Sequence, residues 1–293
     1  MVSTIGWSTI FNVQTGGKMT SACPKKMGKM LLLMETELAP EQMAGGLQIM
    51  ARSQLGRTGQ NLIWLAENTI TRSVLAGDTM AVAAEIRVTE DEGIQADFSF
   101  HQHGAIIYAG GYGRGFSLDG SQLALLAHET RFAFPQEKMD VLADYILDGQ
   151  QWMIWGDTFD YSVTGREISR RGISARSLIA ACERMQQLPS GRDVEFAAFA
   201  RHIQGEDAPG LSAGGNRYFW HSDFMVHRRP DWYASVKTAS DRTLATETGN
   251  NENLQGYHLG QGVTLFMRRG EEYEGLFPLW DWHKLPGITA ATA

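Results

Sequence analysis

The chain has 293 residues, of which 43% are hydrophobic and 20% charged, as in ordinary globular proteins, and it is long enough to bury a large core. Its net charge of −7 provides no overall basic field, so we expect no nucleic-acid partner. Local basic clusters at 166–176 and 217–229 still permit a polyanionic substrate. No apolar run approaches the roughly 20 residues that a membrane span needs, so we expect no membrane partner.

The two ends of the sequence and its cysteines carry little information. Residues 1–22 show no sustained hydrophobic period and predict an irregular segment without the layout of a signal peptide. Cys23 and Cys182 are far apart and lack the spacing of metal ligands, so we expect ordinary buried thiols and no bound metal.

Apolar side chains recur at helical spacing along most of the chain up to about residue 204. Pro24 and Pro40 stand where first turns begin, and Gly77 follows a periodic segment as a helix stop does. The pattern predicts helices at 24–34, 40–54, 60–75, 80–90, 120–132, 135–155, 173–187 and 191–204. Helices of this length, paired without strand signals between them, indicate stacked hairpins, either an α/α toroid or an incomplete one.

The pattern changes at 206–215, where glycine and proline crowd together. Alternating aromatic and β-branched residues then predict strands at 217–220, 232–237 and 262–267. We therefore expect an α+β multidomain chain. Its parts are an irregular segment (1–22), an N-terminally truncated α/α-toroid domain (23–205), a linker (206–215) and a partial antiparallel β-sheet domain (216–293), the start of a β-sandwich that stops in mid-pattern.

The most informative stretch runs from Asp97 to Gly113 and holds two histidines, two tyrosines and four glycines. It is too glycine-rich to predict a helix, yet both flanks read as helical, so we expect a long irregular connection. Such a connection is costly to order unless it is functional. A neutral imidazole from His103 and a phenol from Tyr112, held close together, can move a proton to or from carbon and oxygen.

Three further groups of polar residues could take part in chemistry. They are Asn61 after a glycine at a helix start, Arg166 and Arg170 at a spacing of four, and Glu247, Asn250 and Glu252 around a glycine-containing turn. Each has a plain structural alternative. Asn61 could be a helix N-cap, the arginines a solvated turn, and the loop tyrosine a packing residue. His101 and His103 lack the further partners that a metal site requires.

The order of these features resembles polysaccharide lyase family 8, which includes chondroitin AC, hyaluronate and xanthan lyases. The similarity runs from about Pro24 to 286–288 and so covers nearly the whole chain. It rests on five strings in the same order: DFSFHQH at 97–103, GGYG at 110–113, Gly165-Arg166 with Arg170, GNNENL at 249–254, and WDWHKLPG at 280–287.

The resemblance implies an incomplete α/α toroid followed by antiparallel sheets. It implies cleavage of acidic polysaccharide by β-elimination to a 4,5-unsaturated uronate, without hydrolytic water and without a cofactor. Residue by residue, it assigns catalytic roles to Asn61, His103, Tyr112, Arg166 and Glu247, and substrate binding to Arg170, Asn250 and Glu252. Glu252 is the alternative to Glu247 as the supporting acid.

The implied chemistry gives each group a reason. Asn61 would bind the uronate carboxylate and help it accept charge as the enolate develops. His103 would hydrogen-bond the sugar and share in accepting the C5 proton. Tyr112 would act as base and then acid, and since a phenol is a weak acid, Arg166 beside it would favour the phenolate. Glu247 would orient Arg166 or His103, and Arg170 suits a substrate carboxylate or sulfate.

The sequence departs from the family pattern at both ends. A tandem-tryptophan motif expected before the first matched helix is absent, and the β region stops early, so we expect a chain truncated at both ends. A truncated, inactive remnant or a carbohydrate-binding protein is therefore the alternative function. We expect a monomer, from a parent protein that acts outside the cell or in the periplasm. A glycoside hydrolase is disfavoured, because the catalytic loop lacks a carboxylate pair.

Overall fold

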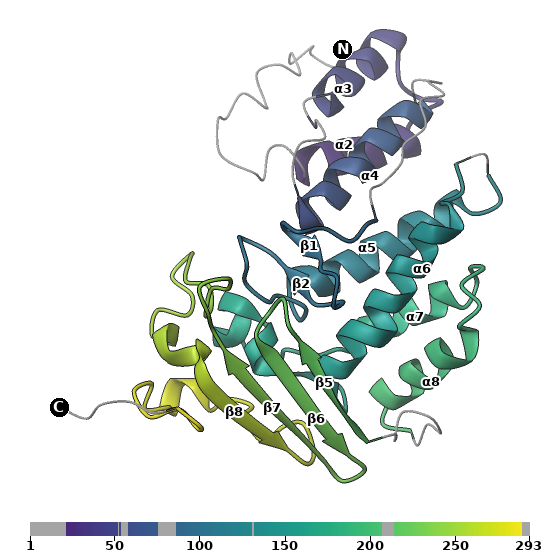
Figure 1. The fold of residues 1–293 in the computed structure, drawn as a ribbon. Helices are drawn as coiled ribbons and strands as arrows, with labels where there is room; N and C mark the ends of the chain where they lie inside the picture. The colour runs from purple at the N-terminus through teal and green to yellow at the C-terminus, as the bar shows by residue number, and fades with distance from the viewer. Residues whose placement is uncertain are drawn as a thin grey trace. The chain divides into compact units, whose positions relative to one another are not determined.

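The computed structural model describes residues 22–51, 53, 58–75, 86–130, 132–206 and 214–288 (Figure 1). The chain forms two compact units, one from Met1–Arg57 and Asn61–Glu85, the other from Thr58–Gln60 and Ile86–Ala293. Within the described ranges, no helix combines the length and the apolar character needed to cross a bilayer.

The first unit contains three of the predicted helices, α2 (Ala22–Leu33), α3 (Pro40–Met50) and most of α4 (Gly59–Leu75). Pro40 occupies the first turn of α3, and the Gln42 side chain accepts a hydrogen bond from the Ala39 backbone N–H. The helix ends four residues before the predicted limit. Its packing core consists of Met27, Leu31, Ile49 and Met50.

The helix predicted at 80–90 is wrong where it can be compared. Residues 80–85 lie outside the described residues, and 86–90 are not helical. Val88 instead bridges Ile94 in parallel, next to a short pair of strands, β1 (Gly93–Ile94) and β2 (Phe100–His101). Pairing with a neighbouring strand has overridden the local helical period here.

The second unit packs four helices beside a sheet (Figure 1): α5 (Tyr112–Ala127), α6 (Gln136–Asp144), α7 (Leu178–Met185) and α8 (Asp193–Ile203). The predicted helix 135–155 is interrupted, since α6 passes into a π-helical turn, a 3-10 turn and the short strand β3 (Ile154–Trp155), which pairs with β4 (Thr158–Phe159). The π-helical turn begins after Asp144 and ends at Gly149, where a Cβ would lie 2.0 Å from the Phe98 carbonyl oxygen. The segment that contains Phe98 therefore packs against the backbone where the π-helical turn ends.

The glycine-rich stretch is only partly a loop, which corrects the prediction. Tyr112 and Gly113 begin α5, eight residues before the predicted helix start. A Cβ on Gly113 would lie 2.3 Å from the Tyr145 hydroxyl and 3.0 Å from the Phe100 ring. Glycine is thus present because α5 packs closely on its neighbours, and it does not mark an irregular segment here.

The sheet contains the predicted strands β5 (Gly215–Phe219), β7 (Trp232–Thr238) and β8 (Gln261–Met267), with β6 (Phe224–Arg229) as an unpredicted addition. All neighbours are antiparallel, in the order β5-β6-β7-β8. This sheet and the helical region confirm the α+β fold class. The connection between β7 and β8, residues 239–260, carries Glu247 and Glu252.

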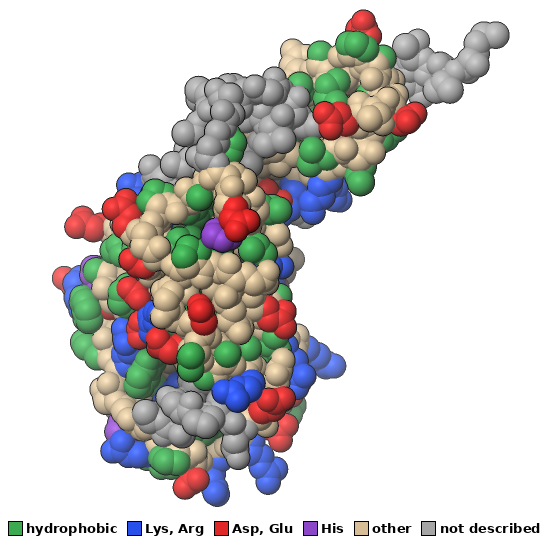
Figure 2. Space-filling view, turned by 90° about the vertical axis from the view of Figure 1, so that its right-hand side faces the viewer, with side chains coloured by type: hydrophobic (Ala, Val, Ile, Leu, Met, Phe, Trp, Pro, Cys, Tyr) green, Lys and Arg blue, Asp and Glu red, His purple; other side chains and the backbone are tan. Residues whose placement is uncertain are grey.

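The basic cluster predicted at 217–229 loses one member as a surface charge, because the side chain of Arg228 in β6 is buried. Its guanidinium lies 5.2 Å from the Trp152 ring and donates to the Ile154 carbonyl at 2.6 Å. Burial lowers the pKa of Arg228 to about 10. Among the described residues visible in Figure 2, both acidic and basic side chains lie on the surface.

Candidate active site

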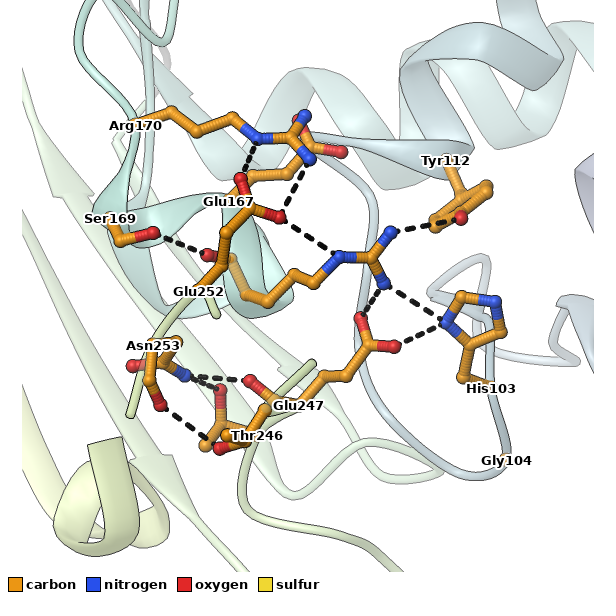
Figure 3. A network of polar contacts seen from close by, with 12 residues as sticks. His103, Gly104, Tyr112, Glu167, Ser169, Arg170, Thr246, Glu247, Glu252 and Asn253 are labelled. Carbon is orange, nitrogen blue, oxygen red and sulfur yellow. Dashed lines mark hydrogen bonds and ion pairs between the residues drawn. The ribbon is translucent and has the colours of Figure 1, made fainter. Parts of the chain in front are cut away.

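Four segments of the second unit meet in one polar cluster (Figure 3). His103 follows β2, Tyr112 is the first residue of α5, Arg166 lies in a 3-10 helix at Gly165–Ser169, and Glu247 lies between β7 and β8. The structure therefore brings together residues that are up to 144 positions apart in the sequence.

Glu247 joins a histidine and an arginine through its two carboxylate oxygens. Oε1 lies 2.6 Å from His103 Nδ1, and Oε2 accepts a hydrogen bond of 2.6 Å from Arg166 Nη1. Because the carboxylate faces Nδ1, we infer that Nδ1 carries the proton of the neutral imidazole, so that Nε2 is the proton acceptor.

Arg166 also donates to the phenol of Tyr112, through Nη2 at 3.2 Å. The Tyr112 and His103 rings meet edge to face, with centroids 4.8 Å apart. The Arg166 side chain is only 9% exposed, and burial alone would lower its pKa. The hydrogen bond with Tyr112 and the negative charge of Glu247 outweigh burial and hold the pKa above its ordinary value. A permanent positive charge therefore faces the Tyr112 oxygen.

Both predicted carboxylates belong to the cluster, although the prediction treated them as alternatives. Glu252 accepts from Arg166 Nε at 3.1 Å and from Arg170 at 2.5 and 2.9 Å. The hydrogen bonds from Arg170 lower the pKa of Glu252, and those from Arg166 add to this shift. Glu247 thus links Arg166 to the histidine, and Glu252 links it to the second arginine.

The sequence analysis did not predict Glu167, although it lies between Arg166 and Arg170. Its Oε2 lies 3.2 Å from Arg170 Nη1 and 4.0 Å from Arg114 Nη2. Burial raises its pKa, while Arg170 and Arg114 act against that shift. Its position directly after Arg166 was the available signal, but sequence alone does not show that its side chain is only 14% exposed.

The turn that carries the two glutamates is built from asparagines. Asn250, Asn251 and Asn253 have φ values of 53°, 62° and 54°, in the left-handed region that asparagine tolerates better than most residues. Asn253 Nδ2 donates to the Glu247 carbonyl at 2.8 Å and to the Thr246 hydroxyl at 2.9 Å. Asn250 lies at the exposed tip of this turn.

Asn61 belongs to the first unit, so its assigned role remains a prediction. The helix α4 begins at Gly59, and Asn61 therefore lies inside its first turn, which contradicts the alternative that it is the N-cap. Gln60, just before it, donates from its backbone N–H to Gln102 Oε1 (3.1 Å) and from its side-chain Nε2 to Asp119 Oδ2 (2.6 Å).

His101 contacts the β5–β6 turn. It is 4% exposed, and its Nε2 lies 2.9 Å from the Ser222 hydroxyl, which donates to Ser99. Asp97 accepts from Ser99 and from the His221 backbone N–H, so the segment 97–103 is anchored to the β5–β6 turn. Across the described ranges, no three His, Cys, Asp or Glu side chains are arranged to hold a metal ion.

Comparison with known proteins assigns a class to this fold and site. The profile of "Polysaccharide lyase family 8, N terminal alpha-helical domain" matches residues 19–195, and that of "Polysaccharide lyase family 8, super-sandwich domain" matches 214–293. Both are domains of polysaccharide lyases. The chain belongs to polysaccharide lyase family 8, which confirms the resemblance.

Relatives agree with this assignment. Chondroitinase-AC of Pedobacter heparinus is 30% identical, over 92% of this chain and 40% of that protein. A hyaluronate lyase of Thermasporomyces composti is 29% identical, over 80% of this chain and 36% of that protein. A solved chondroitinase AC lyase superposes with a TM-score of 0.83 at 28% identity, covering 92% of this chain and 42% of that one. The chain therefore spans about two-fifths of the length of these relatives.

Proposed function

We propose that this chain is the part of a polysaccharide lyase that cleaves uronate-containing acidic polysaccharide, of the chondroitin or hyaluronan type, by β-elimination. The observation that carries the proposal is the Tyr112 hydroxyl at 3.2 Å from Arg166 Nη2, beside the ring of His103. Family membership and the names of the relatives support the substrate class.

In the proposed reaction, Tyr112 as phenolate removes the proton from C5 of the uronate. The C5–H electron pair is first delocalised into the uronate carboxylate as an enolate. It then forms the C4–C5 double bond as the C4–O4 bond breaks, and O4 leaves with the bonding pair. Tyr112 then returns the proton to O4. The cycle consumes no water, and the new chain end is a 4,5-unsaturated uronate.

The other groups lower the barrier at the two ends of this proton path. Asn61 hydrogen-bonds the uronate carboxylate, which gains charge as the enolate forms. His103, whose Nδ1 is oriented by Glu247, has Nε2 available to bond the sugar and share in accepting the C5 proton. Arg166 stabilises the phenolate by opposite charge.

We assign substrate contacts to Arg170, Asn250 and Glu252. Arg170 is half exposed, and its planar donors suit a substrate carboxylate or sulfate. We also propose that the protein acts as a monomer. We place its activity outside the cell or in the periplasm, because a large polyanion does not cross a bilayer unaided.

The test is a panel of chondroitin sulfates, hyaluronan and xanthan, incubated with this chain while ultraviolet absorbance of the conjugated product is followed. We expect absorbance to rise on at least one polymer, and Tyr112→Phe to reduce the rate by about 10²- to 10⁴-fold while polymer binding persists. Tyr257→Phe, at a tyrosine that is 77% exposed, is the matched control and should retain the parent rate.

Two outcomes would contradict the proposal. New reducing ends without absorbance would indicate hydrolysis. Binding of a polymer without any cleavage would favour the carbohydrate-binding or inactive-remnant alternative.

A further inference from the structure

A second tyrosine, Tyr108, supports the ring of Tyr112 from inside the protein. Tyr108 is 0% exposed, and its ring meets that of Tyr112 edge to face, with centroids 5.0 Å apart and an interplanar angle of 85°. It also lies edge-on to His103, at 6.5 Å. Tyr112 is therefore bounded by two rings, of which only His103 belongs to the polar cluster.

Two glycines form the slot that holds Tyr108. A Cβ on Gly111 would lie 2.4 Å from Tyr108 Cε1, and a Cβ on Gly165 would lie 2.2 Å from Tyr108 Cε2. Gly165 also has a φ of 54°, which disfavours other residues. Gly111 precedes Tyr112 and Gly165 precedes Arg166, so the same ring is wedged beside the backbone of both partners of the key hydrogen bond.

The backbone of Tyr108 acts on the same element. Its N–H donates to the Phe100 carbonyl at 2.8 Å, and its carbonyl accepts from Gly113 N–H at 2.9 Å. Gly113 is the second residue of α5, directly after Tyr112. Residue 108 therefore fixes the start of the helix that carries the proposed base.

The hydroxyl of Tyr108 is unsuited to proton transfer. It is buried and finds no hydrogen-bond partner within the described part of the chain. Burial, followed by the negative charge of Glu167, raises the pKa of Tyr108 far above its ordinary value. The two tyrosines thus differ in access and in the groups they meet, although they are only four residues apart.

We propose that Tyr108 is a positioning residue, whose buried ring between Gly111 and Gly165 holds the Tyr112 ring so that its oxygen stays beside Arg166. This inference rests on the proposed function, in which Tyr112 is the base. Orientation matters because a displacement of about 1 Å of a reacting group can reduce a rate by about 100-fold. An aliphatic side chain would fill part of the slot but would not present the flat edge that limits rotation of Tyr112.

The experiment compares Tyr108→Leu, Tyr108→Phe and Phe196→Leu in the full chain, on the polymer that the parent cleaves. Phe196 is a fully buried ring in α8 and controls for the general loss of a core aromatic. We expect Tyr108→Leu to lower kcat by about 10- to 100-fold with KM little changed, and to move the rising limb of the kcat–pH profile to higher pH.

Tyr108→Phe keeps the ring, and since the hydroxyl has no partner we expect it to restore kcat to within about threefold of the parent. Phe196→Leu should lower the melting temperature as Tyr108→Leu does, but leave kcat and the pH profile unchanged. Substrate affinity, measured separately by binding to each variant, should match that of the parent.

The outcomes separate the two proposals. A parent chain without unsaturated product overturns the proposed function. An active parent whose Tyr108→Leu variant keeps its kcat and pH profile overturns only the positioning role. Equal losses in Tyr108→Leu and Tyr108→Phe would also overturn it, because the hydroxyl and not the ring would then be the effective group.

Discussion

His101 and His103 lie two residues apart, yet the structure gives them opposite surroundings. His101 is 4% exposed and meets the Ser222 hydroxyl, whereas the His103 side chain is 35% exposed and meets the Glu247 carboxylate. Burial lowers the pKa of His101 to about 4, so it is neutral across the ordinary pH range. The chemistry of these two histidines is therefore decided by their partners and by solvent access, which the residue pattern does not encode.

Replacing His103 should have the largest effect on catalysis. We expect His103→Gln to lower kcat/KM by about 10²- to 10⁴-fold, since the group that bonds the sugar and shares with Tyr112 in accepting the C5 proton is lost. Thermal unfolding should change little, because the side chain is partly exposed. Measurement of product absorbance and of the melting temperature on the same preparations checks both parts. An active, destabilised variant would reverse the roles assigned to the two histidines.

Replacing His101 should act on stability and its pH dependence. In the unfolded chain the imidazole gains a proton below its ordinary pKa of 6.5, whereas in the folded chain it does so only below about 4. Above pH 6.5 the imidazole is neutral in both states, and its protonation does not affect folding. As the pH falls from 6.5 toward 4, only the unfolded chain gains the proton, so the free energy of unfolding decreases by up to about 3 kcal/mol.

Denaturant unfolding of the parent and of His101→Asn at several pH values tests this contribution. We expect the free energy of unfolding of the variant to fall less steeply between pH 6.5 and 4. An unchanged slope would show that His101 does not contribute.

Replacing Glu247 should have a smaller effect than replacing His103. Glu247→Gln keeps the shape but weakens the charge that orients His103 and Arg166, and we expect kcat to fall by about 10- to 100-fold. Glu252→Gln, which touches both arginines but not the histidine, is the comparison and should affect KM more than kcat. Equal effects on kcat would argue against a special role for the carboxylate beside His103.

Local patterns in the sequence predicted much of the fold. Apolar periodicity and proline positions placed α2, α3 and α4, and alternation placed β5, β7 and β8. They missed β6 because the charged residues at its end hide the alternation, and Arg228 is buried only through its contacts with Trp152 and the Ile154 carbonyl. A buried cation becomes predictable only once its partners are known.

The sequence by itself determined the family and the residue types of the candidate site, because the five strings stand in order along the chain. Only the tertiary structure decided that Tyr112 begins a helix, that Glu247 and Glu252 both contact Arg166, and that Tyr108 lies buried beneath Tyr112. The physical reason is that these contacts join segments up to 86 residues apart, through close approaches at Gly111, Gly113 and Gly165 that no local propensity describes.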